Sequence, residues 1–161
     1  MNLNDTPRGG TFCLSKAGLA IGSSGKDDLD IACPNGTGVG FVIDGVLYYK
    51  ADATDIPVVV TDEDATAVST QADETTCLYL VQLSTAGALT TIKGTEVDTD
   101  ELTAETVNLK LPVGTADTCP IGYTQVVTDG DTFLCGTDDF NKANVTATYV
   151  DLFAIPPHPI A

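Results

Sequence analysis

The chain of 161 residues has no tryptophan, one histidine and one methionine, and aromatic residues make up only 6% of it. Cations are also few, since seven lysines and arginines face 23 aspartates and glutamates, for a formal net charge of −16. A surface of this sign repels phosphate backbones and anionic lipids, so nucleic acid and membrane surfaces are disfavoured as partners. No apolar run approaches about 18 residues, and the first residues lack the basic and apolar regions of a secretion signal. We therefore expect neither a membrane span nor ordinary secretion.

The residue types of common catalytic sites are scarce as well. His158, the only histidine, stands between prolines with no neighbour that could fix its tautomer. Paired carboxylates can hydrolyse glycosides, but most acids here lie in Thr-, Gly- and Ala-rich segments typical of solvated loops. Tryptophan is absent and aromatic residues are few, so a platform for stacking on a sugar is also thin. The glycine-rich segments 18–26 and 35–40 lack the spacing of a phosphate-binding loop. We expect no catalytic residue and no cofactor.

Five cysteines are present, and no two of them have the spacing of a zinc knuckle or a redox pair. They are Cys13, Cys33, Cys77, Cys119 and Cys135. We predict buried, reduced thiols; the alternative is one or two disulfides formed after release from the cell, with Cys119–Cys135 the first candidate. Acidic clusters at 27–30, 62–64 and 129–139 could hold Ca²⁺ or Mg²⁺, but none has the EF-hand spacing, so we predict a solvating coat and no metal site.

Thr, Val, Ala, Asp and Gly dominate the chain, and no sustained segment has helical periodicity. Strands are predicted in pairs: 39–43 with 46–50 around the turn Asp44-Gly45, 77–83 with 89–93, and 121–128 with 132–135. A strand beginning at Pro57 and a final strand over 144–153 complete the set. Short helices are possible over 62–71 and 99–107. The fold class is all-β, a β-sandwich or small jelly-roll-like barrel with hairpins and little helix.

Several predicted strands are apolar on both faces, as in Phe41-Val42-Ile43, Val46 to Tyr49, Val58-Val59-Val60 and Leu78 to Val81. A sheet with one solvated face shows alternation instead, so the second face must be covered. Either a neighbouring subunit covers it, or these are central strands covered by loops. Residues 1–10 are typical of a flexible arm and 155–161 of a polyproline-like tail, which leaves 11–154 as one β domain.

Five segments, in order, resemble one family of proteins. They are Phe12 to Gly22, the hairpin Val42 to Ala51, the strand-turn-strand Tyr79 to Gly94, Pro120-Ile121-Gly122-Tyr123, and Cys135-Gly136-Thr137-Asp138-Asp139. The chain resembles a family of tailed-bacteriophage virion structural proteins, generally head decoration or minor structural components. The resemblance covers most of residues 11–153, and the five cysteines and the strong acidity depart from the family pattern.

This resemblance implies a non-enzymatic capsid decoration or cement protein, made in the bacterial host cytoplasm and carried on the surface of the phage head. The implied partners are the major capsid protein and further copies of the chain, as a trimer or dimer. The two-sided apolar strands, the arm and the tail would supply the contacts, and we name Pro7, Arg8, Phe12, Tyr48, Tyr49, Ile155, Pro156 and Pro157 as interface residues.

Two other functions stay open at this stage. One is a tail-associated adhesin or receptor-binding module, whose loops 23–30 and 62–74 would contact host surface glycans. The other is a small hydrolase.

Overall fold

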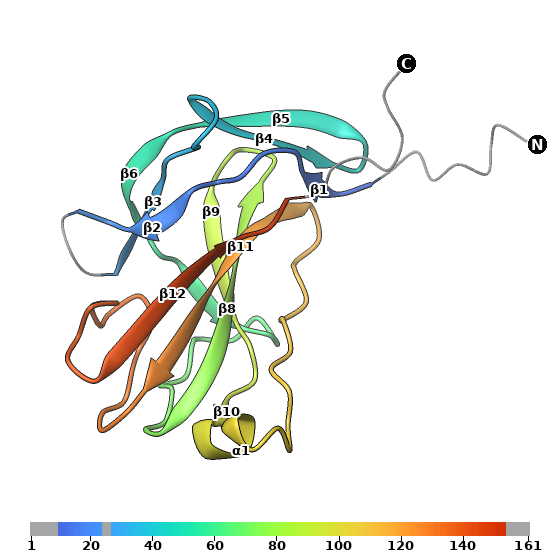
Figure 1. Ribbon diagram of the computed structural model, residues 1–161. Coiled ribbons are helices and arrows are strands. Elements are labelled where there is room, and N and C mark those ends of the chain that lie inside the picture. The colour runs from blue at the N-terminus through green and yellow to red at the C-terminus, as the bar shows by residue number, and fades with distance from the viewer. Residues whose placement is uncertain (1–9, 24–26, 154–161) are drawn as a thin grey trace, which may run out of the picture.

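The computed structural model describes residues 10–23 and 27–153 (Figure 1). The first half contains β1 (Phe12–Cys13), β2 (Leu19–Ile21), β3 (Asp28–Ile31), β4 (Gly38–Ile43), β5 (Val46–Ala51), β6 (Ala53–Pro57) and β7 (Val60–Asp62). The second half contains β8 (Thr75–Ser84), β9 (Leu89–Lys93), β10 (Val97–Asp98), α1 (Thr99–Thr103), β11 (Thr118–Thr128) and β12 (Val145–Asp151). The prediction of an all-β chain with little helix is confirmed. Over the described ranges, no helix has the length and apolar character needed to span a bilayer.

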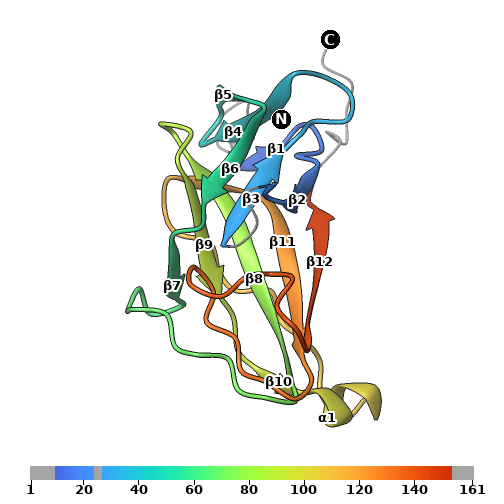
Figure 2. The same ribbon diagram turned by 90° about the vertical axis from the view of Figure 1, so that its left-hand side faces the viewer.

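The strands form three sheets. The largest has the order β12-β11-β8-β9-β7, with β10 also paired to β8, and the smaller ones are β1-β4-β5 and β2-β3-β6. Both small sheets lie at the upper end of the large sheet in Figures 1 and 2, where β1 and β4 contact β11 and β2 contacts β12. None of the three sheets closes on itself within the described residues, so of the two predicted architectures the structure agrees with the sandwich and not with the barrel.

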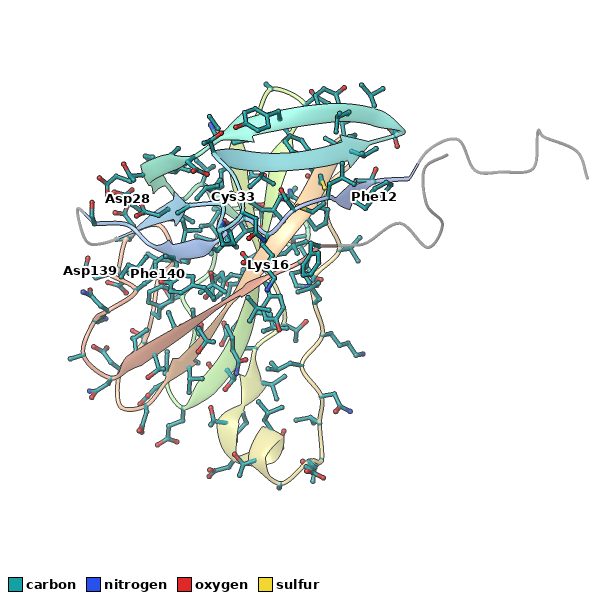
Figure 3. The ribbon with its side chains drawn as sticks, turned by 45° about the horizontal axis from the view of Figure 1, so that its top comes forward. Phe12, Lys16, Asp28, Cys33, Asp139 and Phe140 are labelled. Carbon is teal, nitrogen blue, oxygen red and sulfur yellow. The ribbon has the colours of Figure 1, made fainter. Side chains whose placement is uncertain are left out.

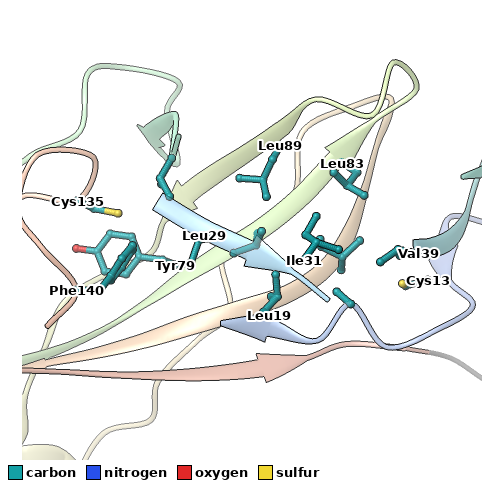
Figure 4. Close-up of a cluster of buried hydrophobic side chains, with 14 of the residues drawn as sticks. Cys13, Leu19, Leu29, Ile31, Val39, Tyr79, Leu83, Leu89, Cys135 and Phe140 are labelled. Carbon is teal, nitrogen blue, oxygen red and sulfur yellow. The ribbon is translucent and has the colours of Figure 1, made fainter. Parts of the chain in front are cut away.

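One hydrophobic core joins all three sheets. Leu19, Leu29 and Ile31 from the β2-β3-β6 sheet meet Tyr79 and Leu83 of β8 (Figure 4). Burying one such side chain contributes about 1.5–3 kcal/mol, so the core is the main source of stability. The buried positions on β3 and on β11 alternate, as expected for strands with one face in the core.

Strand β8 is buried on both faces from Thr76 to Leu83. Its Tyr79 face enters the core, and its Gln82 face is covered by the loop that precedes β11. The Gln82 side chain donates to the Thr115 hydroxyl at 2.7 Å and accepts the Thr115 N–H at 3.2 Å. For β8, the two-sided apolar pattern is therefore explained by a central strand covered by a loop.

The two strongest hairpin predictions are confirmed. Ile43 pairs with Val46 across the two-residue turn, where Asp44 and Gly45 both have positive φ, as a type I′ turn requires. Leu83 pairs with Leu89 in the β8–β9 hairpin. The predicted final strand is confirmed as β12, which pairs along β11 from Val145 to Asp151.

Other local predictions are wrong or partly right. Segment 132–135 is not the partner of β11; Phe133 instead forms an isolated bridge with Gln71. The expected helix over 62–71 does not form: Asp62 ends β7, and the residues after it form a loop that is closed by a bridge between Thr61 and Ala67. Pro57 ends β6 rather than starting a strand. The helix expected over 99–107 shortens to α1, capped by the Asp98 carboxylate.

Candidate binding surface

The outer face of the β1-β4-β5 sheet carries exposed apolar side chains. Its register places Phe12, Val42 and Leu47 side by side, and Gly40 opposite Tyr49. Because side chains alternate along a strand, the neighbours Cys13, Phe41 and Tyr48 point the other way, into the core. The outer face, defined here as Phe12, Leu14, Val42, Leu47 and Tyr49, carries no charged side chain.

Leu47 and Tyr49 are 66% and 60% exposed. Leu14, beside Gly40 through its N–H bond to the Gly40 carbonyl at 2.9 Å, is 37% exposed. Figure 3 shows Phe12 on β1 beside the β4–β5 hairpin. Single exposed apolar side chains are ordinary, whereas a group of them on one sheet face makes that face a candidate binding surface.

Gly38 of β4 shapes this face. An added Cβ at Gly38 would lie 2.6 Å from the Tyr49 hydroxyl oxygen, so the tyrosine ring lies against the bare backbone of β4. The Tyr49 hydroxyl also forms a 3.0 Å hydrogen bond with the Thr37 hydroxyl. The ring is thereby held flat on the sheet, with its outer side exposed.

The structure brings together only some of the interface residues predicted from the sequence. Phe12 and Tyr49 lie on the outer face, whereas Tyr48 lies on the opposite side and stacks on Phe41 with ring centroids 5.7 Å apart. Leu14 was not predicted. Val42 and Leu47 were not named as interface residues, although they lie in the two-sided apolar strands expected to supply contacts. The turn at 44–45, which fixes the pairing of Val42 with Leu47, was the signal available. Pro7, Arg8, Ile155, Pro156 and Pro157 lie outside the described residues.

A second candidate is a cavity of about 430 Å³ between the loop after β7 and the end of β9. Its lining residues are Asp62, Glu63, Asp64, Ser69, Lys93, Gly94, Thr95 and Glu96. The Lys93 ammonium is buried and donates to the Ser69 carbonyl, the Ser69 hydroxyl and the Glu96 carboxylate. All three of its hydrogens are therefore engaged, and Lys93 fastens the loop rather than serving as a base for Ser69. The lining has no aromatic side chain for a sugar to stack on.

The acidic clusters mainly organise loops. The Asp30 carboxylate accepts the Asp55 N–H at 2.8 Å, and Asp62 accepts the Ser69 N–H at 3.2 Å. The Thr132 N–H, and then Lys142 at 3.1 Å, hold the pKa of Asp131 below its usual value. Within the ranges the structure describes, no group of three or more His, Cys, Asp or Glu side chains could hold a metal ion.

All five cysteines are free and buried, which confirms the predicted buried thiols; the alternative Cys119–Cys135 disulfide is not formed. Those two residues do not flank a hairpin, because β11 pairs with β12 instead of with 132–135. Burial raises the pKa of Cys77 and of Cys119 to about 12. Thiols of this kind are protonated and unreactive at neutral pH.

Comparison with family models, with curated proteins and with solved structures finds no match to this chain.

Proposed function

We propose that this chain is a non-enzymatic structural protein of a tailed-bacteriophage particle, a decoration or cement protein that binds the assembled head. The observation that carries the proposal is the apolar outer face of the β1-β4-β5 sheet, where Leu47 and Tyr49 stay exposed beside Phe12. The resemblance in sequence segments supplies the class of partner, the major capsid protein. The strong negative charge suits the surface that faces solvent and keeps particles apart.

The physics of decoration fits a small face of this kind. A protein that binds only the expanded shell stabilises that shell by mass action. Each copy buries a few apolar side chains worth about 1.5–3 kcal/mol each when fully covered, and the symmetry of the shell repeats the contact. Modest single contacts can therefore hold a shell against the pressure of packaged DNA.

A pair of matched variants tests the face. Leu47→Asp adds a charge to the centre of the outer face, and Val113→Asp adds the same charge at a side chain that is 80% exposed elsewhere. Both should fold, because neither side chain is buried. In cosedimentation with expanded, DNA-free shells of the encoding virus, we expect Leu47→Asp to weaken binding at least about tenfold, since an unpaired charge would be buried. Equal binding by the two variants would remove the outer face from the proposal.

The location of the protein tests its class. Hundreds of copies on purified heads fit decoration, whereas a few copies at the tail tip would replace it by the adhesin alternative. For that alternative, loop 62–74 lines the Lys93 cavity, which offers no aromatic platform for a glycan.

A further inference from the structure

The free edge of β5 is the longest apolar strand edge that the described sheets leave unpaired. β5 ends the order β1-β4-β5, and Val46, Leu47 and Tyr49 are 54%, 66% and 60% exposed. Figure 1 shows it along the upper border of the molecule. Sheet edges of this kind are templates for pairing with another strand.

The other long or terminal edges are protected. β7 has three residues and is followed by a loop whose Thr66 carbonyl accepts the Asp62 N–H. β6 is interrupted by positive φ at Asp55 and ends in Pro57. β12 presents exposed threonines, Thr146 and Thr148, and Asp151 binds the Leu19 N–H at its end. β1 and β2, the remaining edge strands, have two and three residues. Among the edge strands of the described residues, β5 therefore combines length with exposed apolar side chains.

We propose that the occupant of this edge is a second copy of the chain, with two β5 strands antiparallel about a two-fold axis. The two β1-β4-β5 sheets then become one continuous sheet, and the two outer faces join into one platform. Such an interface uses the same patch on both copies and closes at two, so it does not grow into fibres. The inference concerns the edge and holds whatever the outer face binds.

The turn restricts the possible registers. A two-residue hairpin turn closes on a hydrogen-bonded pair, here Ile43 with Val46, so Val46, Tyr48 and Lys50 direct their backbone groups toward β4. Leu47 and Tyr49 then direct theirs outward. A symmetric pairing that satisfies these groups has its axis at residue 47, 48 or 49.

The charged residues near β5 distinguish the three positions of the axis. With the axis at Leu47, each Asp44 lies level with Lys50 of the second copy, which gives two opposite-charge pairs. With the axis at Tyr48, Asp44 would meet Asp52 of the second copy, and with the axis at Tyr49 Lys50 would have no acidic partner. β5 itself contains no acid in a chain with net charge −16, so two copies approach here with least repulsion.

Cysteine cross-linking tests the edge and its register, because all five native thiols are buried. In the proposed pair the two Leu47 Cα atoms lie about 5.5 Å apart, within the range a disulfide spans. The two Tyr49 positions lie about 13 Å apart along the strands. Under mild oxidation, we expect Leu47→Cys to give a covalent dimer at least tenfold faster than Tyr49→Cys and the exposed control Val113→Cys.

Sedimentation velocity of the unmodified chain gives the independent measurement. We expect a concentration-dependent monomer–dimer equilibrium, weakened about tenfold by Lys50→Glu and partly restored by adding Asp44→Asn. The proposal is overturned if the chain stays monomeric at about 100 µM, a concentration at which weak dimers form. It is also overturned if Leu47→Cys cross-links at the same rate as Val113→Cys. Faster cross-linking at Tyr49 overturns the register. No shell is present in these experiments, so a dimer that binds no shell refutes only the proposed function.

Discussion

Gln71 offers a sharp test of how the loop after β7 is fixed to the core. Its side chain is fully buried, accepts the Tyr79 hydroxyl hydrogen at 3.0 Å, and donates to the carbonyls of Thr75 and Val126 at 3.1 and 3.2 Å. Its backbone also exchanges two hydrogen bonds with Phe133. The segments around Gln71 and Phe133, neither of which lies in a named strand, are therefore joined at one buried amide.

Gln71→Leu keeps a similar volume and removes all three side-chain hydrogen bonds. Each net hydrogen bond is worth about 1 kcal/mol, and a buried hydroxyl left without an acceptor adds about 1–3 kcal/mol. We expect a loss of about 4 kcal/mol in the free energy of unfolding. Tyr79→Phe removes one bond and leaves the buried Gln71 Oε1 without its donor, and should lower the free energy of unfolding by about 2 kcal/mol.

The double variant separates the shared interaction from the rest. Since Gln71→Leu orphans the Tyr79 hydroxyl, removing that hydroxyl as well should restore about 1–2 kcal/mol relative to additive behaviour. Urea unfolding gives the values: with a slope of about 2 kcal/mol/M, Gln71→Leu should lower the midpoint by about 2 M with the slope unchanged. A shift below about 0.5 M, or additive effects in the double variant, would refute the buried network.

Three further predictions concern the thiols, a glycine and the helix cap. Burial raises the pKa of Cys77 and Cys119 to about 12, against about 8.5 in the unfolded chain. The free energy of unfolding should therefore be level below about pH 8 and fall above it, by about 4 kcal/mol at pH 10. Urea melts at a series of pH values check this, and a free energy of unfolding that rises with pH would contradict it. Gly18→Ala should lose more than about 2 kcal/mol, because φ is +63° and the added Cβ would lie 2.0 Å from the Ala32 carbonyl oxygen, whereas Gly40→Ala, with nothing nearer than 3.9 Å, serves as control in thermal unfolding. Asp98→Ala removes the bonds from the N–H groups of Asp100 and Glu101 and should lower stability by about 1 kcal/mol in urea melts, with Asp98→Asn close to the parent.

The sequence predicts those parts of the fold that local chemistry decides. Asp44-Gly45 specifies both a turn and a register, and the apolar run at 78–81 marks a strand covered on both sides. The turn signal at Asp129-Gly130 led to the wrong partner strand. It ends β11, but the strand's partner is β12, because segment 129–144 folds back to bury Phe133 and Phe140. Pairing over such a separation is set by the core and not by the turn.

Only part of the candidate surface could be predicted from the sequence. Adjacent tyrosines on one strand point to opposite faces, so Tyr48 and Tyr49 could not share one. Which face meets the core depends on how β4 packs against β11, with Phe41 in the core. The addition of Phe12 through β1 is a pairing over thirty residues, Phe12 with Val42, which no local pattern marks. The exposed apolar face thus becomes visible only once the three strands are assembled.

Electron cryo-microscopy of expanded shells saturated with the protein tests the central claim most directly. The account predicts repeated density on the outer surface of the head, with the β1-β4-β5 sheet turned toward the shell and the acidic loops toward solvent. Density confined to the tail tip, shells that stay bare at saturating protein, or a sheet whose Leu47 and Tyr49 face solvent would contradict it.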